Sequence, residues 1–131
     1  MQGSCLCGAV TYEIDHLQNI RFCHCRTCQT AQGAPYIAAG AVLRQHFRWL
    51  TGEDKISSYE SSPGKHRRFC SVCGTPLLSD RASLPHIALR VNTLHEDPQV
   101  RPENHFWTAD DCAWTQDHPN LPHYPEWPPA R

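Results

Sequence analysis

The sequence predicts a mainly β fold whose strands pair mostly antiparallel. Short stretches of alternating apolar and polar residues are separated by Gly, Pro and Asn, a pattern typical of strands joined by turns. No helical stretch is long enough for the crossover that parallel neighbouring strands need. With 131 residues the chain is expected to form a single domain over 1–131, and we expect the Pro- and Trp-rich segment 98–131 to pack on it.

Several segments carry the strand pattern. In the first of them, Val10, Tyr12 and Ile14 fall on one face and polar residues on the other. Later segments are bounded by turn sequences such as Thr51–Asp54 and Ser61–Gly64, whose Gly, Pro, Ser and Asp residues favour chain reversal. In chain order, the predicted strands are Ala9–Ile14, Ile20–His24, Pro35–Leu43, Phe47–Leu50, Ile56–Tyr59, His66–Cys70, Leu77–Ser79, His86–Asn92 and Asn104–Trp107.

One short helix is predicted, and the C-terminal part of the chain differs in composition. Residues Arg26–Gln32 lack a β-branched run, and Gly33 supplies the left-handed conformation at which helices end. Seven of the eleven prolines and three of the four tryptophans lie in 98–131, which excludes long helices there. Because a disordered tail rarely carries so many aromatic residues, we expect an extended segment that packs them against the sheet.

Composition argues against two classes of function. Twelve basic and thirteen acidic residues give a net charge of −1, which removes the electrostatic basis for binding nucleic acid. The longest apolar stretch, Ile37–Leu43, is too short to span a bilayer, so no membrane role is expected. The N-terminal residues lack the basic and apolar regions of a signal peptide, and we expect a cytoplasmic protein.

Eight cysteines are the most informative feature of the sequence. Their density is below that of a typical disulfide scaffold, and clustered cysteines in a reducing compartment are more often metal ligands. A thioredoxin-like redox pair is disfavoured because the βαβ context of such pairs is missing. The eighth cysteine, Cys112, stands alone; the others form three clusters, which are Cys5 and Cys7, then Cys23, Cys25 and Cys28, then Cys70 and Cys73.

The first and third clusters together predict a structural zinc site. Cys5 and Cys7 face the same side of an extended chain, and Cys70 and Cys73 are separated by a two-residue turn. Together the two pairs supply the closed four-sulfur shell that is typical of structural zinc.

The second cluster predicts a different kind of zinc site, so that two zinc ions are expected per chain. Cys23, Cys25 and Cys28 supply three ligands with no evident fourth, an arrangement typical of a catalytic zinc with an open position. The alternative is that His24 or Cys112 completes the shell and both zinc ions are structural.

These motifs resemble the family of glutathione-dependent formaldehyde-activating enzymes and centromere protein V. The resemblance covers nearly the whole chain and rests on the segments Gly3–Gly8, Cys23–Cys28, Phe47–Gly52, Ser61–Gly64, Arg68–Gly74, Val91–Leu94, Asn104–Phe106, Trp114 and Leu121–Pro122. It implies a β-tent fold of stacked antiparallel sheets, a structural zinc on Cys5, Cys7, Cys70 and Cys73, and a catalytic zinc on Cys23, Cys25 and Cys28. The resemblance also implies a carbon–sulfur lyase like S-(hydroxymethyl)glutathione synthase, which joins glutathione to formaldehyde or a related small aldehyde.

The chemistry of the second cluster predicts a small-molecule thiol as ligand. A zinc ion held by three thiolates favours a soft ligand in its open position. The resemblance implies that this ligand is the thiol of glutathione. Arg26, Arg67 and Arg68 are the candidates for binding its two carboxylates. His24 and His105 are the candidates for moving the proton.

The backbone N–H groups at the start of Arg26–Gln32 are candidates for stabilising the alkoxide that develops on the aldehyde oxygen.

Two alternative functions stay open at this stage. One is a non-enzymatic, zinc-stabilised interaction module whose aromatic C-terminal segment forms the partner surface. The other is a lyase that acts on a different thiol adduct.

Overall fold

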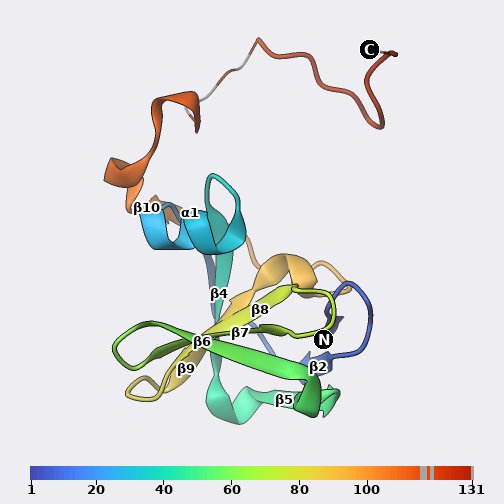
Figure 1. Cartoon of the computed structure of the whole chain (residues 1–131), viewed down its shortest axis with the longest axis vertical. Coiled ribbons are helices and arrows are strands. Elements are labelled where there is room, and N and C mark those ends of the chain that lie inside the picture. The colour runs from blue at the N-terminus through green and yellow to red at the C-terminus, as the bar shows by residue number, and fades with distance from the viewer. Residues whose placement is uncertain (116–117, 119, 131) are drawn as a thin grey trace.

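A computed structural model describes residues 1–115, 118 and 120–130 of the chain (Figure 1). One helix, α1 (Arg26–Gln32), and five 3-10 helices accompany the strands; the 3-10 helices are η1 (Arg44–His46), η2 (Glu53–Lys55), η3 (Val91–Thr93), η4 (Thr108–Asp110) and η5 (Ala113–Thr115). The strands are β1 (Gln2–Ser4), β2 (Thr11–Ile14), β3 (Asn19–Cys23), β4 (Ile37–Leu43), β5 (Phe47–Thr51), β6 (Ile56–Ser62), β7 (Lys65–Cys70), β8 (Pro76–Arg81), β9 (His86–Arg90) and β10 (Pro102–Phe106). No helix in this described part is both long and apolar enough to cross a membrane.

The strands form two sheets, which confirms the predicted mainly β fold. The smaller sheet has the order β1-β2-β5, and the larger has the order β10-β3-β4-β9-β8-β7-β6. Every neighbouring pair is antiparallel except β10 and β3, which run parallel. The prediction of mostly antiparallel pairing is therefore confirmed, with one parallel edge formed by segments far apart in the sequence.

The sequence predicted the positions of α1 and of most strands correctly. The helix spans Arg26–Gln32 as predicted, and Gly33 ends it with a left-handed φ of 61°. The predicted strand His86–Asn92 is two residues too long, because Val91 begins a 3-10 helix. The three-residue strand β1 escaped prediction because Gln2–Ser4 shows no apolar alternation.

The core lies where the small sheet meets the large one. Val10, Tyr12 and Ile14, which were predicted to share a face, are all fully buried. The Tyr12 ring stacks on Phe47 with centroids 5.5 Å apart. Its hydroxyl lies 2.6 Å from Oγ1 of Thr93, just after β9, so this side chain ties the two sheets together.

Position 52 requires glycine for two reasons: its backbone conformation is left-handed, and the backbone of Ala9 leaves no space for a side chain. It has φ = 74°, and a Cβ atom there would lie 1.9 Å from the carbonyl oxygen of Ala9. We therefore expect Gly52→Ala to lower the free energy of unfolding by about 2–4 kcal/mol, the sum of left-handed strain and overpacking. The matched control is Gly64→Ala. Gly64 has a similar left-handed φ of 77°, but a Cβ atom there would meet only Nη1 of Arg81, at 3.9 Å. Urea unfolding of both variants measures the difference, and equal losses would contradict the steric argument.

The C-terminal segment packs on the sheet only through its first part. Strand β10 pairs with β3, whereas the described residues beyond η5 run away from the sheets (Figure 1). Trp107, Trp114 and Trp127 are 61%, 69% and 87% exposed. The expected packing of the C-terminal aromatic side chains on the sheet is thus not seen for these three tryptophans. Trp127 lies beyond η5, where the chain leaves the sheets, whereas Trp107 and Trp114 are exposed although they lie before that point.

Candidate functional site

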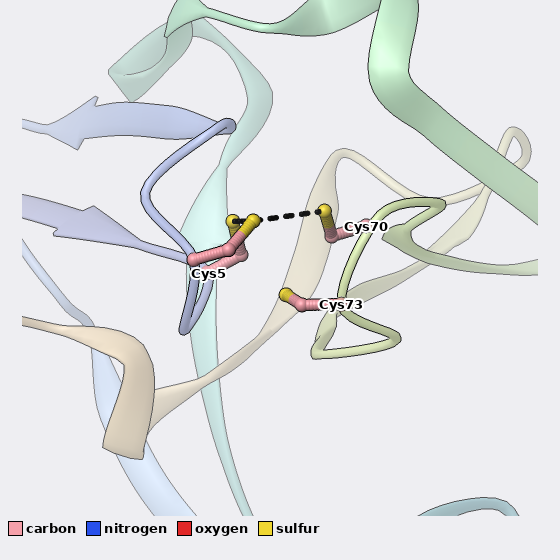
Figure 2. Close-up of side chains that lie close together, drawn as sticks. Cys5, Cys70 and Cys73 are labelled. Atoms are coloured by element: carbon pink, nitrogen blue, oxygen red, sulfur yellow. Dashed lines mark hydrogen bonds between the residues drawn. The ribbon is translucent and has the colours of Figure 1, made fainter.

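Four cysteines from distant parts of the chain meet in one cluster, and Figure 2 shows three of them, Cys5, Cys70 and Cys73, close together. Cys5 and Cys7 lie in the loop after β1, Cys70 ends β7, and Cys73 lies in the turn before β8. All four sulfurs lie within 4.8 Å of one another. The Cys5–Cys7 and Cys7–Cys70 sulfur distances are 3.6 and 3.9 Å. Zinc–sulfur bonds of about 2.3 Å in a tetrahedron separate neighbouring sulfurs by about 3.8 Å, so this donor set fits zinc.

Backbone and hydroxyl groups around this cluster favour thiolates. The N–H of Val10 donates to Sγ of Cys5 at 3.3 Å, and the N–H of Val72 donates to Sγ of Cys70 at 3.4 Å. The Thr75 hydroxyl lies 3.2 Å from Sγ of Cys73 and lowers the pKa of that thiol to about 5. A cluster of thiols surrounded by donors is prepared for a cation, which supports the predicted grouping of these ligands.

The second cluster is built where β3 passes into α1. Cys23 ends β3, Cys25 is the N-cap of α1, and Cys28 lies in its first turn. Their sulfurs lie within 4.8 Å of one another. Among the described residues, no fourth Cys, His, Asp or Glu brings a ligand atom within that distance of all three. The structure therefore groups these cysteines as predicted, and together they could offer three ligands to a metal ion.

The charge around Cys28 favours its thiolate. Hydrogen bonding from Cys23, then from Cys25 and Arg67, lowers the pKa of Cys28 to about 4. The same interaction with Cys28 raises the pKa of Cys23. Nη2 of Arg67 lies 3.6 Å from Sγ of Cys28. Since a cation already stabilises one thiolate here, the cluster can hold negative charge before any metal binds.

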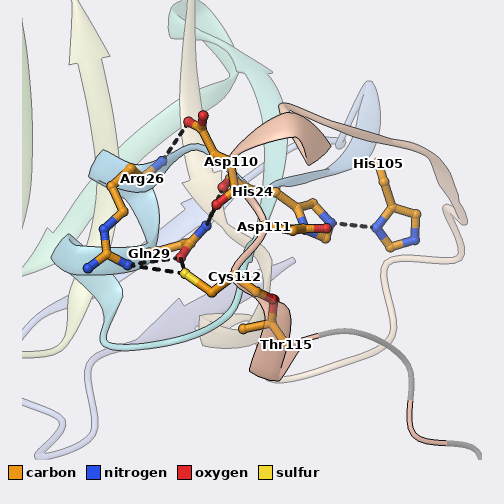
Figure 3. Close-up of polar contacts among 8 residues, drawn as sticks. All are labelled: His24, Arg26, Gln29, His105, Asp110, Asp111, Cys112 and Thr115. Atoms are coloured by element: carbon orange, nitrogen blue, oxygen red, sulfur yellow. Dashed lines mark hydrogen bonds and ion pairs between the residues drawn. The ribbon is translucent and has the colours of Figure 1, made fainter.

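His24 is not the fourth ligand of this cluster, because both of its ring nitrogens have other partners (Figure 3). Its Nδ1 lies 2.7 Å from Oδ1 of Asp111, and its Nε2 lies 2.7 Å from Nδ1 of His105. His24 is 8% exposed, whereas His105 is exposed. The two histidines that were predicted to move a proton are therefore in direct contact, and the buried His24 lies between the exposed residues Asp111 and His105.

Residues 110–112 lie against the start of α1 (Figure 3). Oδ2 of Asp110 accepts a hydrogen bond from the backbone N–H of Arg26 at 3.0 Å. Nε2 of Gln29 donates to the carbonyl oxygens of His24 at 2.6 Å and of Asp110 at 3.1 Å. Sγ of Cys112 lies 3.8 Å from Nη1 of Arg26, outside the cluster, so Cys112 does not complete the ligand shell.

The proposed alkoxide-binding role of the α1 backbone needs correction. The N–H of Arg26 already donates to Asp110, and the N–H of Cys28 donates to Sγ of Cys25 at 3.3 Å. These two N–H groups at the start of α1 are therefore already occupied and are not open to an alkoxide. The sequence could not show this, because Asp110 lies 84 residues from Arg26.

A basic groove opens beside Cys25. It consists of two adjoining cavities of about 310 and 390 Å³ that share Arg26, Thr27, Ser61 and Arg67. The first cavity is also lined by Cys25, Ser62, Lys65, Arg81, Trp107 and Asp110. We call these two cavities the basic groove. The sequence did not predict that Lys65, Arg81 and Asp110 line this groove. Lys65 and Arg81 reach it because β7 and β8 pair in the large sheet, and Asp110 reaches it because η4 packs against the start of α1.

The predicted substrate arginines occupy different positions. Arg26 and Arg67 line the basic groove, and Arg67 also contacts Cys28. Arg68 points elsewhere, since its Nη2 lies 3.3 Å from Oδ2 of Asp80.

Trp107 also lines the groove and has a left-handed φ of 60°, an uncommon conformation for a bulky residue. A strained aromatic residue at the edge of a groove is a common feature of binding sites.

Comparison with known proteins finds similarity to a family model, to a curated protein and to solved structures. A family model described as glutathione-dependent formaldehyde-activating enzyme matches residues 1–110. A Schizosaccharomyces pombe protein named as an uncharacterised lyase is 30% identical over 77 residues, which are 58% of this chain and 54% of that protein. The chain thus matches about half the length of this relative. A crystal structure of a Rhodobacter sphaeroides protein is 26% identical with a TM-score of 0.64, and the match covers 78% of this chain and 98% of that one.

Proposed function

The chain belongs to the family of glutathione-dependent formaldehyde-activating enzymes, and on this premise we propose that it is a zinc-dependent lyase that acts on carbon–sulfur bonds. It joins glutathione or a similar thiol to formaldehyde or a related small aldehyde. The sulfur adds to the carbonyl carbon, and the thiol proton ends on the former carbonyl oxygen. The product is an S-hydroxymethyl adduct, and no other reactant is needed.

One observation carries this proposal, namely a cluster of three cysteines beside a basic groove. Cys23, Cys25 and Cys28 supply three ligands, and the described residues supply no fourth. A zinc ion bound there offers one position to a soft ligand and keeps the sulfur of that ligand deprotonated. Because Cys25 also lines the basic groove, a thiol that reaches the cluster extends its remaining groups into the groove.

The charges of the groove match those of glutathione, which carries two carboxylates and one ammonium group. Arg26, Lys65 and Arg81 line the part of the groove next to Cys25 and are suited to the carboxylates. Asp110 lies among them and is suited to the ammonium group. A groove with several cations and one carboxylate favours this zwitterionic peptide over a simple dianion.

The contacts of His24 support a route for the proton. An ionised Asp111 accepts the Nδ1–H of His24, which leaves Nε2 as an acceptor for the Nδ1–H of His105. The remaining nitrogen of His105, which is an exposed residue, then exchanges protons with water. We propose that this chain moves the proton between the reacting groups and solvent.

The test is a titration of cobalt-substituted protein with glutathione, followed by the absorption of the cobalt–thiolate bonds. We expect one glutathione per chain to change the spectrum of the three-cysteine site. S-methylglutathione, which keeps all charges but has no free thiol, should leave the spectrum unchanged. NMR detection of the S-hydroxymethyl adduct after adding formaldehyde tests the reaction itself.

Absence of glutathione binding at millimolar concentration would contradict the proposed function. It would favour the second candidate, a zinc-stabilised interaction module. The observation behind that alternative is the exposure of Trp114, Tyr124 and Trp127 in the C-terminal segment.

A further inference from the structure

Arg90 is a buried cation with no carboxylate partner among the described residues, although the thiols of Cys23, Cys25 and Cys28 lie close enough to favour its charge. It ends β9, and only 4% of its surface is exposed. Its Nη1 donates to the carbonyl oxygen of Ala88 at 3.0 Å. Its Nε is the only buried side-chain nitrogen or oxygen without a hydrogen-bond partner in the part of the chain that the structure describes. Burial lowers the pKa of Arg90 to about 10, so it is still charged at neutral pH. A buried, incompletely bonded guanidinium is costly and needs an anionic partner.

The space next to Arg90 is suited to such a partner. Arg90 lines a cavity of about 280 Å³ together with Arg67, Arg68 and Tyr59, and no acidic side chain lines it. Arg68 is already paired with Asp80, whereas the described residues give Arg67 and Arg90 no carboxylate partner. The Cys28 thiol lies on one side of Arg67, but two guanidinium groups that face a cavity without a carboxylate still attract an anion into it.

Arg67 connects this cavity to the proposed reaction site. It lines both the cavity and the basic groove, and its Nη2 lies 3.6 Å from Sγ of Cys28. Its Nε donates to Oγ of Ser61 at 3.0 Å, which fixes the guanidinium between the two spaces. An anion that binds Arg67 in the cavity is therefore separated from the three-cysteine cluster by a single guanidinium group.

We propose that Arg90 and Arg67 form a carboxylate-binding site in this cavity, which holds one end of a substrate beside the three-cysteine cluster. A carboxylate accepts two parallel hydrogen bonds from a guanidinium, and Ala31, Phe69, Pro76 and Leu78 provide an apolar wall for a short carbon chain. The inference rests on the proposed function for the identity of the reactants. The carboxylate belongs either to the thiol peptide or to the aldehyde, which would then be of the glyoxylate class, since formaldehyde has none.

The test compares the zinc-loaded wild type with Arg90→Met by calorimetry. Three probes separate the sources: cysteamine has a thiol but no carboxylate, glyoxylate has a carboxylate but no thiol, and glutathione has both. We expect Arg90→Met to bind cysteamine like the wild type and to lose about 10- to 100-fold in affinity for glutathione, glyoxylate or both. Loss for glyoxylate assigns the carboxylate to the aldehyde, and loss for glutathione alone assigns it to the thiol. Unchanged affinity for both would overturn the proposal.

Two further variants make the outcome specific. Arg48→Met removes an arginine of β5 that pairs with Glu13 and Asp15 and does not line the cavity, and this variant should bind all probes like the wild type. Arg90→Lys keeps the charge but not the planar donors, and we expect an intermediate loss of affinity. It also keeps the test decisive if Arg90→Met does not fold.

Thermal unfolding of the ligand-free protein gives a readout that a structural role would not produce. Because Arg90 is buried without a full set of partners, we expect Arg90→Met to unfold at the same temperature as the wild type or higher. A lower unfolding temperature together with unchanged binding would show that Arg90 only supports the fold. If the wild type binds neither thiol probe, the proposed function fails, while glyoxylate still tests the carboxylate site.

Discussion

Replacing Cys70 with serine is expected to leave the chain without a stable native fold. The four-cysteine cluster joins the loop after β1 to the end of β7, and its sulfurs fit the spacing of one zinc ion. Structural zinc sites contribute about 10–16 kcal/mol of apparent binding free energy, as much as the whole stability of a typical domain. Cys70 is fully buried, so serine would also place a hydroxyl in the core next to the ion.

Circular dichroism and metal analysis check this expectation. The variant should lose the cooperative unfolding transition and the metal of this cluster. The matched control is Cys112→Ser, the same chemical change at a cysteine outside both clusters, which should keep the fold and two zinc ions. A Cys70→Ser protein that unfolds cooperatively with two zinc ions per chain would refute the assignment.

Replacing Cys25 with serine is expected to remove the second metal and the thiol-binding activity while the fold persists. Sγ of Cys25 accepts a hydrogen bond from the N–H of Cys28 as the N-cap of α1. Serine is a preferred N-cap residue, so the helix should keep its cap, whereas a hydroxyl is a poor replacement for a thiolate on zinc. Since the two clusters share no cysteine, the first metal should stay in place.

Metal analysis should then give one zinc ion per chain, and glutathione binding should fall by at least about 100-fold, the equivalent of roughly 3 kcal/mol. Cys112→Ser again serves as the control and should keep both zinc ions. If the Cys25→Ser variant binds glutathione like the wild type, the thiol does not bind at this cluster and the proposed function fails.

The sequence was informative wherever a local signal determines the structure. Helix α1 was predicted at Arg26–Gln32 because composition and Gly33 act within a few residues. The buried face of β2 followed from two-residue alternation, and both cysteine groupings followed from spacing. These predictions depend on neighbouring residues in the sequence and not on contacts between distant segments.

Features that depend on contacts between segments far apart in the sequence were not predictable. The parallel pairing of β10 with β3 brings His105 to His24, which lies 81 residues earlier. Arg90 gave no signal in the sequence, because its importance comes from burial without a partner. Asp110 and Asp111 looked like ordinary solvated residues until η4 placed them against α1.

The pairing of β10 with β3 also has a consequence for the order in which the protein assembles during synthesis. The three cysteines between 23 and 28 leave the ribosome early, but Asp110 and His105, which contact their neighbours, are translated more than 75 residues later. Contacts between such distant segments form late, because the chain must first close a long loop. A nascent chain therefore carries these thiols for most of its synthesis before the C-terminal segment covers them. A zinc ion bound at that stage would protect them from oxidation, so we expect metal supply during translation to influence how much of the protein keeps these thiols reduced.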